Sequence, residues 1–166
     1  GFERLDLGYN LAARWNEAEQ EIVVDRLTLT GERMGALSFS GTIGNVTPEL
    51  FAANVATAEA AAAALTLKNL TIDVRNDGLA PALIALAAWE EDKDPEVFHL
   101  ALTGLARALP LAILGATPEA LGLGDALGSF LAGAPNLKLT LTSVDPAGIG
   151  VADLMAAEEN PAVLKD

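Results

Sequence analysis

The chain has 166 residues, of which 23 are acidic and 10 are Lys or Arg, so its formal net charge is −13. A surface this acidic repels phosphates, which excludes nucleic acid and anionic lipid headgroups as partners. Because 51% of the residues are nevertheless hydrophobic, we predict one folded domain over residues 1–166 rather than a disordered chain.

The N-terminal part of the chain is predicted to form an antiparallel meander. Its apolar and polar side chains alternate with a period of two, as a half-buried strand requires. Polar turns separate three such segments, at residues 5–15, 22–30 and 37–43. Sequential strands joined by short turns pair in an antiparallel sense.

Helix starts are marked four times by a capping residue followed by proline. The side-chain oxygen of the cap accepts an otherwise unpaired backbone N–H, and proline at the next position loses no hydrogen bond. The first of these starts is predicted to begin an Ala-rich helix that continues to Ala64. The four pairs are Thr47-Pro48, Asp94-Pro95, Thr117-Pro118 and Asn160-Pro161.

The remaining elements complete an α+β pattern. A strand, a helix, a long helical region, a strand and a short helix are predicted at residues 65–75, 79–89, 94–133, 137–144 and 151–158. Within the helical region, Pro110 is expected to end or kink the first helix. The predicted fold is α+β, with about five mainly antiparallel strands and several helices packed on one face.

The ends and the charge spacing lead to further expectations. The chain starts at Gly1 rather than Met and stops at Lys165-Asp166 soon after a helix start, so we expect a fragment of a longer protein.

The longest run without a charged residue covers residues 34–48, less than the roughly 18–20 apolar residues of a membrane span. No span is therefore predicted within this sequence. The absence of cysteine excludes disulfides and thiolate chemistry.

A catalytic set is not recognisable, so we expect a non-enzymatic protein without a cofactor. His99 is the only histidine and lies in a predicted helix, which favours a structural role. None of the four serines lies in a Gly-x-Ser-x-Gly turn. Gly122, Gly124 and Gly128 form a glycine string, but no predicted strand precedes it and no basic residue accompanies it. Close helix packing is therefore preferred to dinucleotide binding.

The densest acidic cluster lies between two predicted helices. A hard cation such as Ca²⁺ takes six to eight oxygen ligands, but the spacing is not that of a calcium loop, and Lys93 interrupts it. Acids in the first turn of a helix complement the helix dipole. No metal site is assigned, and cation binding stays open as an alternative. The cluster comprises Glu90, Glu91, Asp92, Asp94 and Glu96.

The two faces of the predicted sheet indicate two kinds of partner. One face is rich in Ser and Thr and could receive another domain or strand, although Thr also simply favours strands in water. The other face is lined by Leu and Ala. We expect a filled core there, with an apolar cavity suited to acyl chains as the alternative. The Ser and Thr positions are Thr28, Thr30, Ser38, Ser40, Thr42, Thr71, Thr140 and Thr142.

Two segments resemble exported envelope proteins of Gram-negative bacteria. Residues 130–148, FLAGAPNLKLTLTSVDPAG, resemble an element in which a Leu-rich helix, an alternating Leu strand and a Pro/Gly turn follow one another. Residues 65–86, LTLKNLTIDVRNDGLAPALIAL, are similar to the strand, turn and helix of the same proteins. The resemblance carries no catalytic residue. It implies an extracytoplasmic, periplasmic domain, distantly like AsmA-type envelope and lipid-handling proteins.

These observations lead to two alternative functions from different classes. The first is a non-catalytic domain of an envelope-associated protein that binds an apolar ligand such as a lipid. The second is a protein–protein interaction or structural module that uses the Ser/Thr-rich face or an edge strand. An enzyme is the third alternative, and the oligomeric state stays open.

Overall fold

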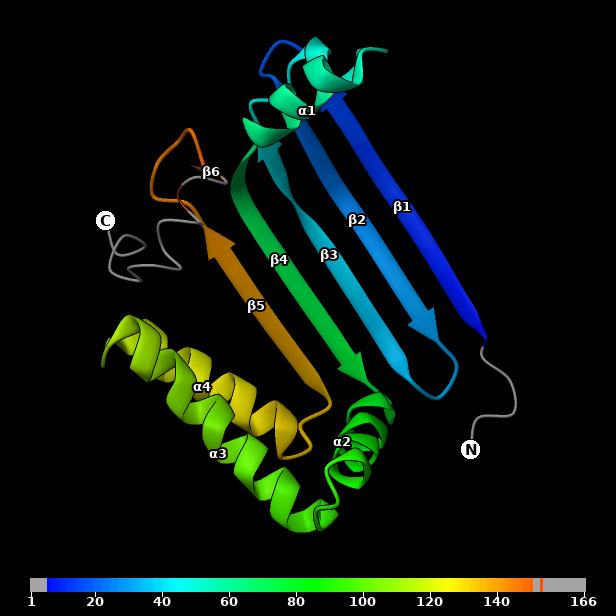
Figure 1. Cartoon of the computed structure of the whole chain (residues 1–166), viewed down its shortest axis with the longest axis vertical. Coiled ribbons are helices and arrows are strands. Elements are labelled where there is room, and N and C mark those ends of the chain that lie inside the picture. Colours follow the sequence, from blue (N-terminus) through cyan, green and yellow to red (C-terminus); the bar gives the residue numbers. More distant parts are fainter. Residues whose placement is uncertain (1–5, 151–152, 154–166) are drawn as a thin grey trace. The chain divides into compact units, whose positions relative to one another are not determined.

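The computed structural model describes residues 6–150 and residue 153. Five long strands alternate in direction in a sheet of order β1-β2-β3-β4-β5 (Figure 1). The α+β class and the N-terminal meander are therefore confirmed. The strands are β1 (Leu7–Asn16), β2 (Glu21–Gly31), β3 (Gly35–Gly44), β4 (Thr66–Asn76) and β5 (Asn136–Thr142).

A sixth, two-residue strand was not predicted from the sequence. This strand, β6 (Ile149–Gly150), pairs antiparallel with β4, so that Thr66 faces Gly150 and Leu67 faces Ile149. The predicted helix at residues 151–158 and the predicted start at Asn160-Pro161 lie outside the described residues.

Two of the predicted helix caps are confirmed, whereas Thr47 makes no side-chain capping hydrogen bond before Pro48. Asp94 accepts hydrogen bonds from the backbone of Glu96 and Val97, and Thr117 accepts one from Ala120, which confirms both as caps. The helices are η1 (Pro48–Phe51, a 3₁₀ helix), α1 (Val55–Ala63), α2 (Leu79–Glu90), α3 (Pro95–Leu114) and α4 (Pro118–Leu131).

The single helix predicted from Pro48 to Ala64 is wrong, because η1 and α1 are separate. Asn54 forms the second start: its side chain accepts a hydrogen bond from the backbone N–H of Thr57 at 3.1 Å. An Asn oxygen at this position satisfies one of the unpaired N–H groups of the helix that follows. Pro110 does not end its helix, since α3 continues to Leu114, and the other predicted outcome, a kink, stays a prediction. Pro110 is the buried residue of α3.

The chain divides into two compact units, and each of the strands β1 to β5 passes through both. The first unit comprises Gly1–Tyr9, Leu29–Leu37 and Asp73–Leu139, and so contains α2, α3 and α4. The second comprises Asn10–Thr28, Ser38–Ile72 and Thr140–Asp166, and so contains η1, α1 and β6.

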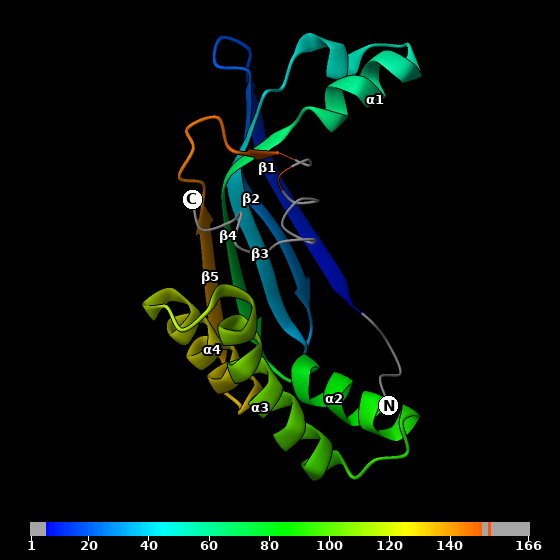
Figure 2. The same ribbon diagram turned by 60° about the vertical axis from the view of Figure 1, so that its left-hand side comes forward.

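In the first unit, α3 and α4 lie side by side (Figures 1 and 2). A Cβ added to Gly124 would lie 2.5 Å from the carbonyl oxygen of Arg107, and one added to Gly128 would overlap the Arg107 side chain. Gly122 has open space instead. The prediction that this glycine string serves close helix packing is confirmed for Gly124 and Gly128.

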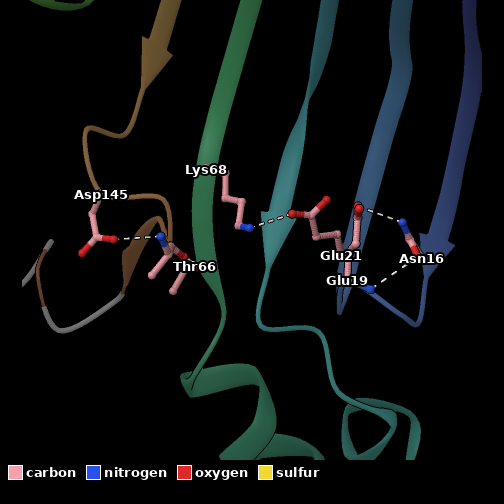
Figure 3. Close-up of polar contacts among 7 residues, drawn as sticks. Asn16, Glu19, Glu21, Thr66, Lys68 and Asp145 are labelled. Carbon is pink, nitrogen blue, oxygen red and sulfur yellow. Dashed lines mark hydrogen bonds and ion pairs between the residues drawn. The ribbon is translucent and has the colours of Figure 1, made fainter.

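In the second unit, polar contacts join the strands to one another and to the helices. Lys68 Nζ lies 2.6 Å from Glu21 Oε1 (Figure 3). Gly44 makes room for this ion pair, since a Cβ there would lie 2.8 Å from Lys68 Cε. Asn45 Nδ2 donates to the carbonyl of Ala64, just after α1, at 2.7 Å.

Few apolar side chains are buried in the part of the chain that the structure describes. The alternating pattern predicted that the apolar residues of β1 are half-buried. They are exposed instead: Leu7 by 67%, Tyr9 by 83% and Leu11 by 61%. The prediction of a half-buried first strand is therefore wrong. β1 stands at one end of the strand order. The buried apolar residues are Val46, Ala88, Ala120 and Leu137.

Candidate functional site

An apolar cavity of about 430 Å³ lies within the first unit. Apolar side chains contribute most of its wall, including Leu29 of β2, Leu37 of β3, Val74 of β4 and Phe130 of α4. The pocket is partly open to the surface, since its lining residue Leu7 is 67% exposed. It agrees with the alternative expectation of an apolar cavity in the chemistry of its wall, and the expectation of a filled core stays a prediction.

Close backbone contacts set the geometry of the strands around the cavity. Gly35 has a φ of +119°, and a Cβ at this position would overlap the carbonyl oxygen of Arg75. Only glycine combines this dihedral angle with this approach. The turn between β2 and β3 is joined to the end of β4, because the backbone N–H of Asp77 donates to the carbonyl of Met34 at 3.1 Å.

Asn76 positions the start of α2 beside the cavity. Its side-chain Oδ1 accepts hydrogen bonds from the backbone of Gly78 at 3.2 Å and of Ala80 at 3.0 Å. Its backbone N–H donates to the carbonyl of Pro135 at 2.8 Å, which joins the end of β4 to the segment before β5. One residue therefore holds two parts of the cavity wall.

A second cavity of about 250 Å³ lies in the same unit. It shares Asn76, Ala80 and Phe130 with the larger one. Its wall also includes Glu96 and His99, both on α3. This smaller cavity therefore has a polar part, whereas the larger one is almost entirely apolar.

The charged residues of the two walls differ in sign. Arg75 is the charged residue of the larger cavity, and its Nε donates to Asp77 Oδ2 at 2.9 Å. Glu96 is the charged residue of the smaller cavity when His99 is neutral. Neither wall holds a cluster of basic side chains that would favour a multiply charged anion.

The histidine singled out in the sequence belongs to the smaller cavity. His99 Nε2 forms a hydrogen bond with the carbonyl of Leu131, the last residue of α4. The contact joins two helices and caps an unpaired carbonyl at a helix C-terminus. His99 thus has a structural contact and also lines a cavity, which the sequence did not indicate.

The acidic cluster is used for helix capping and a local ion pair. Asp94 caps α3, and Glu91 pairs with Lys93. Within residues 6–150 and 153, no three His, Asp or Glu side chains come together in an arrangement that could hold a metal ion.

On the Ser/Thr-rich strand positions, Thr28 Oγ1 and Ser38 Oγ lie 3.1 Å apart and form a cross-strand pair.

Helix α3 has an apolar and exposed surface that the sequence reading missed. With 20 residues, it is long and apolar enough to cross a membrane by length and composition alone, and 6% of its most apolar 18-residue stretch is buried. The sequence analysis looked for a long run without charged residues and missed this helix, because Arg107 interrupts it. Val97 is 65% exposed and Leu100 is 73% exposed.

Comparison with known proteins yields a family. Neither the curated proteins nor the solved structures include a match to the chain. One family model matches residues 28–166, which include every helix and the strands β3 to β6. The chain therefore belongs to the protein family that this model defines, whose description is "Uncharacterized protein".

Proposed function

We propose that this chain is a non-catalytic, extracytoplasmic domain of a bacterial envelope-associated protein, and that it binds an apolar ligand in the larger cavity of the first unit. The observation that carries the proposal is the cavity itself, with a volume of about 430 Å³ and an apolar wall. Ligand-binding pockets usually have volumes of about 300–1,000 Å³. The space therefore suits one flexible hydrocarbon chain.

The chemistry of the wall supports an aliphatic ligand. Each methylene group that moves from water into such a site contributes about 0.8 kcal/mol. Leu29, Leu37 and Val74 offer dispersion contacts, and Phe130 is the single aromatic side chain of this wall, whereas sugars and bases bind preferentially to sites with several aromatic planes. The extracytoplasmic setting is supported by the resemblance of residues 65–86 and 130–148 to exported envelope proteins.

Ligand extraction tests the proposal directly. We expect organic extracts of the purified chain, analysed by mass spectrometry, to contain an acyl-bearing molecule in a ratio approaching one per chain. Ala80 borders both cavities, so Ala80→Leu should lower the amount retained at least tenfold by occupying the space. Ala108→Leu is the matched control, because Ala108 is exposed on α3 and borders neither cavity.

Two results would contradict the proposal. If the wild-type chain carries no ligand and also binds no added long-chain alcohol in calorimetry, the cavity is not a binding site. Equal retention by Ala80→Leu and Ala108→Leu would place the bound molecule elsewhere. Circular dichroism of each variant shows whether it is folded.

The exposed first strand favours a second candidate function, a protein–protein interaction module. β1 is a long strand at the end of the sheet order, and its apolar residues Leu7, Tyr9 and Leu11 are more than half exposed. Long, apolar edge strands pair readily with another strand. Light scattering should then detect a dimer that Tyr9→Lys converts to a monomer, and a monomeric wild-type chain at all concentrations would contradict self-pairing.

A further inference from the structure

The two cavities of the first unit are neighbours that share part of their lining, and they are the larger and the smaller half of the ligand site inferred below. Asn76, Ala80 and Phe130 belong to both walls. The larger half is almost entirely apolar, whereas the smaller half contains Glu96 and His99. We infer that the ligand is a single-chain amphiphile with a hydroxyl head group, whose tail occupies the larger half and whose head lies at Glu96 and His99. This inference rests on the proposed function and specifies its ligand class.

The smaller half offers hydrogen-bond acceptors to the head group. The carbonyl of Leu131 can only accept a hydrogen bond, so the Nε2 of His99 that faces it carries the proton. In the neutral imidazole, Nδ1 is then an acceptor. Glu96 lies three residues earlier on α3, so the two side chains are neighbours on one helix surface. Two adjacent acceptors select a head group that donates a hydrogen bond.

The acidic side chains near the site favour an uncharged head over an anionic one; Lys93, paired with Glu91, is the basic residue of the same segment. Glu96 is negative, and Asp94, two residues before it, accepts hydrogen bonds from the first turn of the same helix. The nearest acids along the chain are Glu90, Glu91 and Asp92. A carboxylate head group would meet this negative potential, whereas a hydroxyl group would not.

Phe130 sets how the tail fits. Since Phe130 borders both halves, we expect its size to decide how far a tail in one half can extend toward the other. Each additional methylene should tighten Kd about fourfold while space is left, since 0.8 kcal/mol corresponds to that ratio. The affinity should then level off at one chain length. A smaller side chain at position 130 should move that plateau to a longer tail.

Calorimetry with matched probes tests the head group. Dodecanol and dodecanoate have the same tail, and at about pH 8 the second is fully ionised. We expect dodecanol to bind at least tenfold more tightly to the wild-type chain. Glu96→Gln should tighten dodecanoate binding about three- to tenfold and weaken dodecanol binding, because an amide oxygen is a weaker acceptor than a carboxylate, so that the preference for the alcohol narrows. Glu119→Gln is the matched control, because Glu119 holds the same position in the first turn of α4 and borders neither cavity.

Variation of tail length tests the role of Phe130. In a series of alcohols with 8 to 16 carbons, Phe130→Leu should move the plateau in affinity to a longer chain while the preference for alcohol over carboxylate persists. Equal or tighter binding of dodecanoate by the wild-type chain, with no response to Glu96→Gln, would overturn the inference and leave the proposed apolar site intact. Binding of neither probe would instead overturn the proposed function.

Discussion

The two units of the chain attach their helices by different means. In the first unit, α3 and α4 meet where glycine lets one backbone approach another, as Gly124 approaches the carbonyl of Arg107. In the second unit, polar side chains make the attachments, as Asn45 does to the carbonyl of Ala64. The contact between Gly124 and Arg107 borders neither cavity, and the hydrogen bond between His99 and the carbonyl of Leu131 is a polar contact between the same two helices, α3 and α4. Hydrogen bonds between side chains and backbone suit a region where exposed turns must be joined.

The difference also predicts how each unit responds to mutation. A methyl group added at a glycine contact meets a backbone that cannot move aside. An exposed or half-exposed polar contact can be replaced by water, so its loss costs less. Substitutions in the first unit should therefore produce the larger losses of stability.

The largest effect is expected at Gly35. Gly35→Ala places a Cβ against the carbonyl of Arg75 in a residue whose φ is +119°, and should cost about 4 kcal/mol or more of unfolding free energy. Urea denaturation measures it. Gly133→Ala separates the two causes, because Gly133 has a φ of +109° and no neighbouring atom within 4 Å, so strain alone should cost about 1–2 kcal/mol. Equal losses would show that the contact with Arg75 contributes nothing.

The next effect is expected between α3 and α4. Gly124→Ala should cost about 2 kcal/mol, because its new Cβ would overlap the carbonyl of Arg107. Gly122→Ala, in the same helix and in open space, should instead stabilise the protein by up to about 1 kcal/mol through helix propensity. Thermal denaturation of the two variants provides the measurement. A stabilising Gly124→Ala would contradict close packing at this point.

A smaller effect is expected for the ion pairs of the second unit. The side chains of Lys68 and Glu21 are 31% and 15% exposed, whereas those of Arg14 and Asp25 are 63% and 49% exposed. Double-mutant cycles to Ala should give a coupling of about 1 kcal/mol for the first pair and about 0.5 kcal/mol or less for the second. A stronger coupling in the exposed pair would reverse this ranking. Added salt should weaken the exposed pair more.

The smallest effect concerns Glu49 in η1. A hydrogen bond from the Thr47 side chain lowers the pKa of this carboxyl group. A pKa that is lower in the folded state contributes stability above the usual range for Glu, and this contribution is lost as the pH falls through the lowered pKa. Thr47→Val should raise the pKa of Glu49 toward its ordinary value, as measured by NMR titration. An unchanged pKa would exclude the hydroxyl group as the cause.

Local signals in the sequence predicted the elements well. The caps at Asp94 and Thr117, the strands β1 to β5 and the α+β class agree with the structure, because capping and alternation depend on neighbours along the chain. The wrong single helix from Pro48 to Ala64 also has a local cause, because Asn54 starts α1 without a following proline.

The sequence alone determined the order and type of the five long strands and of α2 to α4, and the acidic, aliphatic composition of the chain. Only the tertiary structure decided that Phe130 borders two cavities, that His99 lies beside Glu96 in one of them, and that the apolar row of β1 is exposed. The physical reason is that hydrogen bonding within an element is set by residues a few positions apart. Burial is set instead by which distant surfaces meet and how completely they fill the space between them.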